Sequence, residues 1–289
     1  MQASLLTNLL LPLALGIIML GLGLGLTLDD FRRVARYPRA VLIGLALQTL
    51  VLPWAAFGLA LGFGLPAELA VGLMLLAASP GGATANIYSH LARGDVALNI
   101  TLTAINSLLC LLTLPVILNL SLEYFLGAGQ YVPPPTKKVI EVAAIILLPV
   151  AIGMVVRARA AGFAARTEKP IRLLSVLVLA LLVVAAVAQE WKTLTTYFAI
   201  VGLACLLFNL ASMGAGYAAP LALRLPKKQA IAIAMEIGIH NGTLAIFIAL
   251  NVLQNATISV PAAVYSLLMF VTAAVFAWWV SRGGRDAAG

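Results

Sequence analysis

One acidic residue, Glu236, lies in the middle of a strongly apolar stretch, AIAIAMEIGIHNGTLAIFIAL (230–250). A carboxylate at bilayer depth is costly, so it normally faces a protein interior or a wet cavity and marks an ion or substrate path. The residues that follow it are poor helix formers with small or polar side chains: Gly238, His240, Asn241, Gly242 and Thr243. A carboxylate beside a broken helix predicts a cation site built into an interrupted membrane span.

Few other polar residues lie within the apolar runs, and most of them carry oxygen ligands of the kind that hard cations prefer. They are Gln48, Thr84, Asn86, Asn99, Thr101, Thr103, Asn106, Asn209, His240 and Asn241. Asn99 and Thr103 are four residues apart and face the same side of a helix. For Asn106, Asn209 and Thr101, the simpler interpretation is a hydrogen bond between helices. His240 is open to three interpretations: a neutral hydrogen-bonded ring, an ion ligand or a titrating group.

The composition places these residues in a membrane protein. The chain of 289 residues is 63% hydrophobic and 10% charged, with a mean hydropathy of +1.07, whereas soluble domains carry about 25% charged residues. Cys110 and Cys205 lie in apolar runs and suggest no disulfide framework, and no Cys/His metal spacing is present. The first apolar run follows no basic residue, so it is predicted to be a membrane span rather than a secretory signal.

Apolar runs of about 20 residues predict nine membrane spans. Their ranges are roughly 5–27, 39–62, 66–90, 95–118, 136–157, 170–189, 194–222, 229–250 and 259–281. If the segment between the first two spans is cytoplasmic, 15 of the 18 Lys and Arg residues fall on that side. The positive-inside rule then places the N-terminus outside and the C-terminus in the cytoplasm. This distribution accounts for the net charge of +8 without nucleic-acid binding, for which no aromatic-basic or groove-reading motif is present.

Two of the predicted spans contain a polar, glycine-rich interruption. The third carries SPGGATAN (79–86), the eighth carries residues 236–243, and the two run in opposite directions through the membrane. Each is the next-to-last span of its half, with Pro133–Pro135 near the middle of the chain. Interrupted segments at matching positions of inverted halves are typical of the binding site of a secondary transporter. Broken backbone at that depth must be covered by protein or line a cavity.

Residues 80–103 (PGGATANIYSHLARGDVALNITLT) and 236–245 (EIGIHNGTLA) resemble the two signature regions of the bile acid:sodium symporter family. Residues 15–31, 48–53 and 66–72 also fit, so the resemblance covers nearly the whole chain. It implies an all-α polytopic membrane protein with inverted repeats and two crossed discontinuous helices. The expected nine-helix form has a core domain (39–118 and 194–281) and a panel domain (5–27 and 136–189).

The resemblance also implies two sodium sites that share Glu236. The first would use Asn86, Asn99, Thr103 and Glu236; the second would use Gln48, Glu236, His240 and the backbone carbonyls of Ile237 and Ile239. Three positions depart from the common pattern. Ala85 and Asn99 stand where serines are usual, and His240 stands where a glutamine is usual. An imidazole offers a hard cation only nitrogen, so sodium at one site with a proton near His240 remains an alternative.

The expected function is sodium-coupled symport of an organic anion, bile acid-like or a small carboxylate such as pantoate, by alternating access across the inner (plasma) membrane. Residues expected to meet the substrate are Ala83, Thr84, Asn241, Met269 and Phe270. Expected partners are the anion, Na⁺ and the bilayer, with no cofactor beyond the coupling ion and no obligate protein partner. The alternatives are proton-coupled or sodium-independent transport and a non-transporting membrane sensor. A membrane enzyme is not expected, because His90 and His240 have no matching cysteine or second carboxylate at depth.

Overall fold

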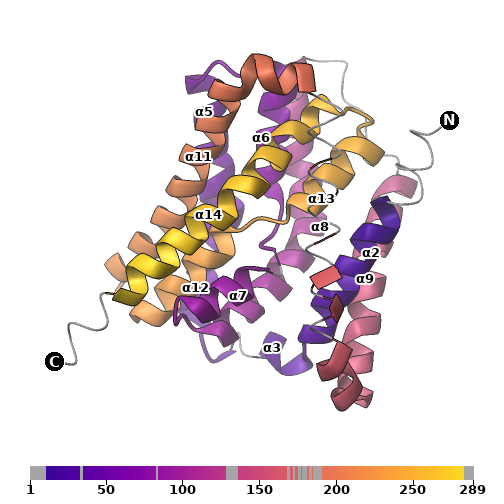
Figure 1. The fold of residues 1–289 in the computed structure, drawn as a ribbon, viewed down its shortest axis with the longest axis vertical. Helices are drawn as coiled ribbons and strands as arrows, with labels where there is room; N and C mark the ends of the chain where they lie inside the picture. Colours follow the sequence, from indigo (N-terminus) through magenta and orange to yellow (C-terminus); the bar gives the residue numbers. More distant parts are fainter. Residues whose placement is uncertain are drawn as a thin grey trace.

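The structure is a computed structural model. It describes residues 11–32, 35–82, 84–127, 136–167, 170–171, 173–174, 177, 181, 184 and 191–282. These residues form helices joined by short turns, with one isolated β-bridge (Figure 1). Among them, four helices are long and apolar enough to cross a membrane: Pro38–Gly62, Val96–Leu126, Ala199–Ala222 and Thr257–Arg282. The chain is therefore an all-helical, multi-pass membrane protein.

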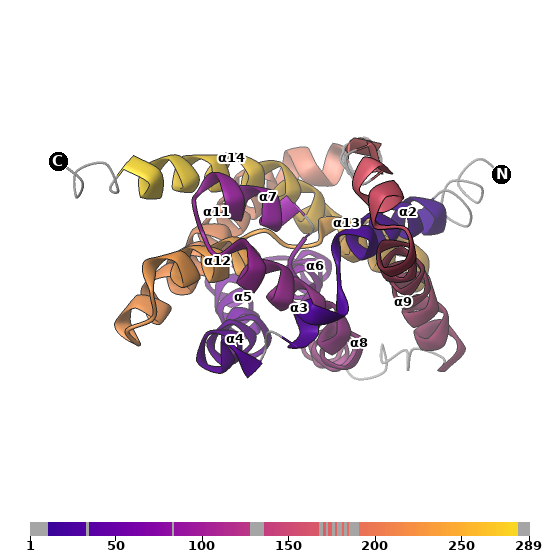
Figure 2. The ribbon, with the colours of Figure 1, turned by 90° about the horizontal axis from the view of Figure 1, so that it is seen from below.

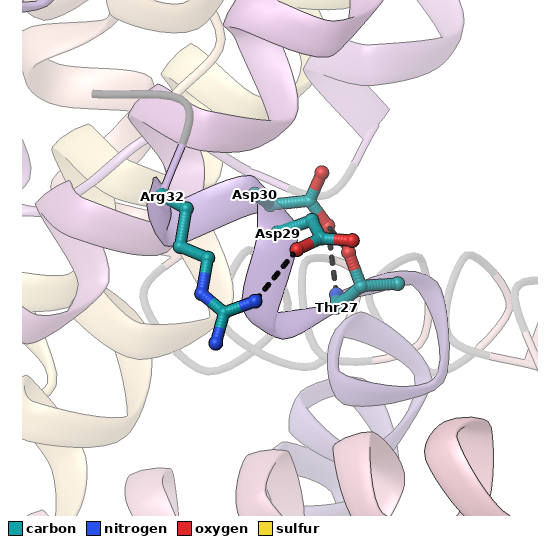
Figure 3. Close-up of polar contacts among 4 residues, drawn as sticks. All are labelled: Thr27, Asp29, Asp30 and Arg32. Carbon is teal, nitrogen blue, oxygen red and sulfur yellow. Dashed lines mark hydrogen bonds and ion pairs between the residues drawn. The ribbon is translucent and has the colours of Figure 1, made fainter. Parts of the chain in front are cut away.

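The first described helix, α2 (Leu11–Gly25), is followed by a sharp turn into the short helix α3 (Leu28–Arg32). Figure 3 shows how this turn is held. The backbone N–H and the hydroxyl of Thr27 both donate to Asp30 Oδ2, each at 2.7 Å. This is the geometry of a capping box, in which the third helical residue reaches back to the residue that caps the helix. Arg32 and Asp29 form an ion pair at 3.3 Å, but both side chains are exposed and such pairs contribute little.

The second span contains a widened turn beside a proline. It consists of α4 (Pro38–Ala46), the π-helical turn η3 (Leu47–Val51) and α5 (Leu52–Gly62). Pro53 has no N–H, and its ring crowds the carbonyl four residues earlier, so the regular α-helical bonding fails at this point. π turns of this kind are frequent at functional sites. The buried side chain of Gln48 projects from the widened turn.

The third predicted span is two helices separated by an extended break. Helix α6 (Ala67–Ala78) ends at Ser79, whose ψ of 143° is extended, because the following Pro80 disfavours the helical conformation of the residue before it. Helix α7 (Thr84–Leu91) follows the break. The long helix α8 (Val96–Leu126) then begins at Asp95, whose carboxylate accepts the backbone N–H of Leu98 at 3.1 Å.

The eighth predicted span is interrupted in the same way. After α11 (Trp191–Ala222), helix α12 (Lys227–Gly238) stops at its C-terminal glycine. Helix α13 (Gly242–Phe247) starts where Asn241 Oδ1 accepts the backbone N–H of Leu244 at 3.1 Å, and it continues into the π turn η4 (Ile248–Val252). A 3₁₀ turn, η5 (Thr257–Ser259), leads into α14 (Val260–Arg282).

Helices α2 and α9 (Thr136–Arg159) pack against each other at one side of the molecule (Figures 1 and 2). Their backbones touch at glycines, since a Cβ added to Gly153 would lie 2.6 Å from Leu20 O and 2.7 Å from the carbonyl carbon of Gly23. Small residues are what permit such close packing of helices in lipid. Helices α4 to α8 and α11 to α14 form the larger group, which contains both interruptions.

The expected count of nine spans remains a prediction. The start of the first span, 5–27, lies outside the described residues, as does most of the sixth, 170–189. The helices found at the remaining positions agree with the predicted ranges within a few residues at most ends, although α8 runs on to Leu126, beyond the expected end at 118.

Candidate functional site: a buried carboxylate where two broken helices cross

The two interruptions meet and pair through one antiparallel β-bridge. Gly81 and His240 form the β-bridge. The N–H of Gly82 donates to Ile239 O at 2.7 Å, and the N–H of Asn241 donates to Pro80 O at 2.8 Å. Each break thereby satisfies backbone groups that the other lost when its helix stopped, which is how non-helical backbone can persist inside a membrane protein.

Glu236 lies at this crossing and is completely buried. The hydroxyl of Thr103 donates to Glu236 Oε2 at 2.6 Å, and Asn106 Nδ2 donates to Oε1 at 3.1 Å. Both donors come from α8, while the carboxylate comes from α12. The backbone N–H of Gly81, in the other break, is also directed at the carboxylate. A Cβ added to Gly81 would overlap the carboxylate carbon and oxygens, so only glycine allows this contact.

The carboxylate has hydrogen-bond donors but no cationic side chain. Within the part of the chain that the structure describes, no lysine or arginine pairs with Glu236. An isolated buried charge is very costly unless it is paired or neutralised. The site therefore requires either a cation or a proton when Glu236 is enclosed.

Unpartnered amide oxygens lie on α7 and α8, two helices that pack against α12. Asn99 Nδ2 donates to Ala232 O at 2.7 Å, one turn before Glu236, which leaves Asn99 Oδ1 buried without a hydrogen bond to any described residue. Asn86 Oδ1 and Asn106 Oδ1 are buried and unpartnered in the same sense. Ala85 is fully buried on α7 and adds no oxygen. Carboxylate, hydroxyl and amide oxygens are a ligand set for a hard cation, so these residues fit a sodium ion.

Gln48 and His240 converge on one carbonyl in the first break. Gln48 Nε2 donates to Ser79 O at 2.9 Å and to Ala77 O at 3.2 Å. His240 Nδ1 lies 3.1 Å from the same Ser79 O, and since a carbonyl can only accept, Nδ1 carries the hydrogen. Gln48 Oε1 and His240 Nε2 are buried and have no partner among the described residues. His240 thus ties the two interruptions together through its side chain.

Two residues that the sequence did not assign to the site, on α11 and α14, pack against the end of α12. Asn209 Nδ2, on α11, and the hydroxyl of Tyr265, on α14, each donate to Gly238 O at 2.9 Å. Because α12 ends at Gly238, this carbonyl has no acceptor role within the helix, and the Asn209 and Tyr265 side chains cap it instead. The rings of Phe208 and Tyr265 flank the His240 ring at centroid distances of 5.6 and 5.4 Å. A buried tyrosine needs a partner for its hydroxyl, but sequence alone does not say which carbonyl supplies it.

The residues expected to meet the substrate come from three elements around the crossing. Thr84 begins α7, Asn241 caps α13, and Met269 and Phe270 lie on α14; Ala83 lies outside the described residues. Phe270 stacks on Tyr88 of α7 with centroids 6.1 Å apart. This gives the region an aromatic wall formed between α7 and α14.

The sequence predicts hydrogen bonds between helices for three polar residues, and the structure gives different outcomes for them. The interpretation is confirmed for Asn106, which joins α8 to α12, and for Asn209, which joins α11 to α12 and α14. It is wrong for Thr101, whose hydroxyl donates to Ala97 O of its own helix at 2.8 Å. A threonine in a helix can always bond the carbonyl four residues back, so it needs no second helix.

Comparison with known proteins identifies the family of the chain. Residues 12–197 match the model of the Sodium Bile acid symporter family. The chain belongs to this family. Because the family is one of transporters, the chain is a transport protein rather than an enzyme.

Individual relatives cover most of the chain. It is 30% identical over 277 residues to the "uncharacterized sodium-dependent transporter YocS" of Bacillus subtilis (strain 168), covering 95% of this chain and 84% of that protein. It is 28% identical over 276 residues to the "probable sodium/metabolite cotransporter BASS2, chloroplastic" of Oryza sativa subsp. japonica, covering 95% of this chain. Mouse P3 protein is 30% identical over 225 residues. The chain spans less than two thirds of these last two relatives, 64% and 47% of their lengths.

Proposed function

We propose that the protein is a sodium-dependent cotransporter that moves an organic anion across the plasma membrane by alternating access. The observation that carries this proposal is the buried Glu236 carboxylate, which lies between two broken helices without a cationic partner among the described residues. Membership of the Sodium Bile acid symporter family and similarity to proteins named as sodium-dependent support it.

Sodium acts in this proposal as a co-substrate held by α7, α8 and α12. Glu236 supplies the negative charge, Thr103 its hydroxyl oxygen, and Asn86 and Asn99 their unpartnered amide oxygens. Binding of the cation neutralises the carboxylate and draws together the first break, which carries Gly81, and the end of α12, which carries Glu236. The ordered crossing then offers the anion a formed site.

A second ion near Gln48 and His240 has weaker support. Ile239 O already accepts the N–H of Gly82, and Ser79 O already accepts from both Gln48 and His240. His240 offers only Nε2, a nitrogen, to an ion, with Gln48 Oε1 as the nearby free oxygen. Glu236 and the carbonyl of Ile237 would have to complete this site. The observations therefore favour one principal sodium position, on the α8 side of the carboxylate.

The substrate position proposed for the anion lies beside the start of α13. Asn241 Oδ1 is used to cap this helix, which leaves its Nδ2 as a donor. Helix starts favour negative charge, so the start of α7 at Thr84 adds to the attraction. Met269, Phe270 and the Tyr88 ring supply apolar surface. This combination suits a carboxylate or sulfate joined to an apolar body, such as a bile acid-like compound or a small branched carboxylate.

The sodium dependence can be tested without knowing the substrate. Purified protein in detergent is titrated with NaCl at constant ionic strength against choline chloride, and its thermal unfolding is followed. A ligand that binds only the native state raises stability by RT ln(1 + [L]/Kd), so sodium should raise the Tm of the wild type with saturation. Glu236→Gln keeps the size of the side chain and removes the charge, so the sodium response should disappear.

Two outcomes would contradict the proposal. A wild-type Tm that is equal in sodium and choline at every concentration would exclude a sodium site. A full sodium response in Glu236→Gln would place the ion elsewhere. Stability or uptake that follows pH and ignores sodium would instead favour a proton-coupled transporter of the same fold.

A further inference from the structure

Asn106 contacts the site carboxylate but is absent from the ligand set expected for sodium. It lies three residues after Thr103 on α8, so the two side chains project from the same face of the helix. Thr103 donates to one carboxylate oxygen of Glu236 at 2.6 Å and Asn106 to the other at 3.1 Å. The two α8 residues therefore hold the carboxylate by both of its oxygens.

The carbonyl oxygen of the Asn106 amide lacks a hydrogen-bond donor in the part of the chain that the structure describes. Asn106 is 2% exposed, and its Oδ1 has no hydrogen-bond partner among the described residues. Nearby donors on the same helix are already used: Ser107 Oγ donates to Thr103 O at 2.7 Å, and Cys110 Sγ donates to Ser107 O. A buried acceptor without a donor lowers stability by about 1–3 kcal/mol. The link between helices uses only Nδ2 of Asn106 and does not account for the buried, unpartnered Oδ1.

The terminal torsion of an asparagine exchanges its Nδ2 and Oδ1 without any movement of the backbone. With Nδ2 towards Glu236, the amide donates to the carboxylate; with Oδ1 in that place, it presents an uncharged oxygen where a cation would lie. The same side chain can thus donate to the carboxylate when no cation is bound and offer an oxygen to the cation when one is bound. Asn99 lacks this freedom, because its Nδ2 is engaged with Ala232 O at 2.7 Å.

We propose that Asn106 is a positioning residue of the sodium site. Its Nδ2 holds the Glu236 carboxylate when no ion is bound, and its Oδ1 turns to the sodium ion when one is bound. This inference rests on the proposed sodium coupling. It adds an oxygen on α8 at a site where Ala85 of α7 supplies none.

The test compares Asn106→Leu with Asn255→Leu in the sodium titration of thermal stability. Leucine has the same branched shape as asparagine and no polar end. Asn255 also donates its Nδ2 to a carboxylate, Glu68 Oε1 at 2.7 Å, but Glu68 lies at the opposite end of α6 from the break. Both substitutions therefore remove a hydrogen bond from an asparagine to a carboxylate. Only Asn106→Leu should weaken sodium binding, with the half-saturating concentration raised about tenfold, whereas the half-saturating concentration of Asn255→Leu should stay within about twofold of the wild type.

A second variant keeps the test decisive if Asn106→Leu does not fold. Asn106→Asp retains the size and an oxygen but replaces the donating Nδ2 by an acceptor, so two carboxylates then face each other. Like charges at this distance repel. In choline the Tm of Asn106→Asp should be below that of the wild type, and saturating sodium should raise it by more degrees than it raises the wild type.

The results separate the two proposals. The inference is overturned if the wild type responds to sodium and Asn106→Leu keeps the half-saturating sodium concentration of the wild type. It is also overturned if sodium raises the Tm of Asn106→Asp by no more than it raises that of the wild type. In either case Asn106 is only a link between helices. If the wild type itself shows no response to sodium, the proposed function fails first and the inference falls with it.

Discussion

At the scale of single residues, the properties of the site follow from one carboxylate that is completely enclosed by neutral groups. Thr103, Asn106 and Gly81 supply donors, which lower the cost of the ionised form without cancelling its charge. Since a buried charge must be neutralised, Glu236 needs a cation or a proton when the site is closed. In the proposed transport cycle, this requirement would couple the sodium gradient to the conformational change.

The close approach of Gly81 to this carboxylate gives a prediction for Gly81→Ala. The added methyl group would overlap the carboxylate of Glu236, and overpacking of this kind costs about 1–3 kcal/mol. We expect a lower Tm in choline and a weaker sodium response, measured in the same thermal titration. Gly58→Ala is the control, because a Cβ at Gly58 meets nothing within 4 Å. An unchanged sodium titration for Gly81→Ala would mean that this contact is not required for ion binding.

Glu236 could be found from sequence because a carboxylate inside an apolar run has few explanations. Asn106 carried a weaker signal, its three-residue spacing from Thr103 on a face that already held Asn99. That spacing predicts a shared face but not which helix the face meets. Asn209 could be predicted to link helices, whereas Tyr265 carried no signal. Their common partner, Gly238 O, could not be predicted for either residue, because it becomes available only through the geometry of the broken helix.

At the scale of elements, the breaks in α6–α7 and α12–α13 are encoded by local chemistry and stabilised by each other. Pro80 ends α6 and Gly238 ends α12, and the two free stretches then exchange backbone hydrogen bonds. These interruptions could be predicted, since proline, glycine and asparagine are poor helix formers. The π turn at Leu47–Val51 is harder to predict, because a proline in a helix can also produce a kink.

The cap on Gly238 gives a prediction for Tyr265→Phe, which removes one donor to the end of α12 and keeps the ring against His240. A net hydrogen bond contributes about 0.5–1.5 kcal/mol, which corresponds to a Tm lower by roughly 1–6 °C in a chain of this size. Tyr217→Phe is the matched control. Its ring packs on Phe276 and Trp279, and its hydroxyl has no hydrogen bond to another described residue. Equal Tm values for the two variants would show that the Tyr265 hydroxyl does not stabilise the break.

At the scale of the whole molecule, contacts between distant segments gather basic residues at one end. Arg39 donates to Leu223 O beside Arg224, Lys227 donates to Val280 O beside Arg282, and the turn at Asp95 donates its N–H to Lys228 O. The sequence places all of these residues on one side of the membrane. The orientation itself follows from the charge count and remains a prediction.

Labelling of single cysteines in intact cells tests this orientation. Lys192→Cys should react with a membrane-impermeant maleimide added outside, and Arg93→Cys should react only after the cells are permeabilised. Both positions are exposed at helix ends, and the native Cys110 and Cys205 are only 4% and 1% exposed, so background labelling should be low. Reaction of Arg93→Cys but not Lys192→Cys in intact cells would reverse the topology.

The pairing of the two interruptions has a consequence for the order of synthesis. Gly81 and His240 are separated by about 160 residues, and ribosomes add roughly 5–20 residues per second. The first interruption therefore waits roughly 8 to 30 seconds in the nascent chain before the segment that completes its backbone hydrogen bonds exists. During that interval, Pro80 O and the N–H of Gly82 lack their final partners. A chain that terminates before residue 239 never acquires them, so such a product should be a substrate for membrane quality control even though its first spans are complete.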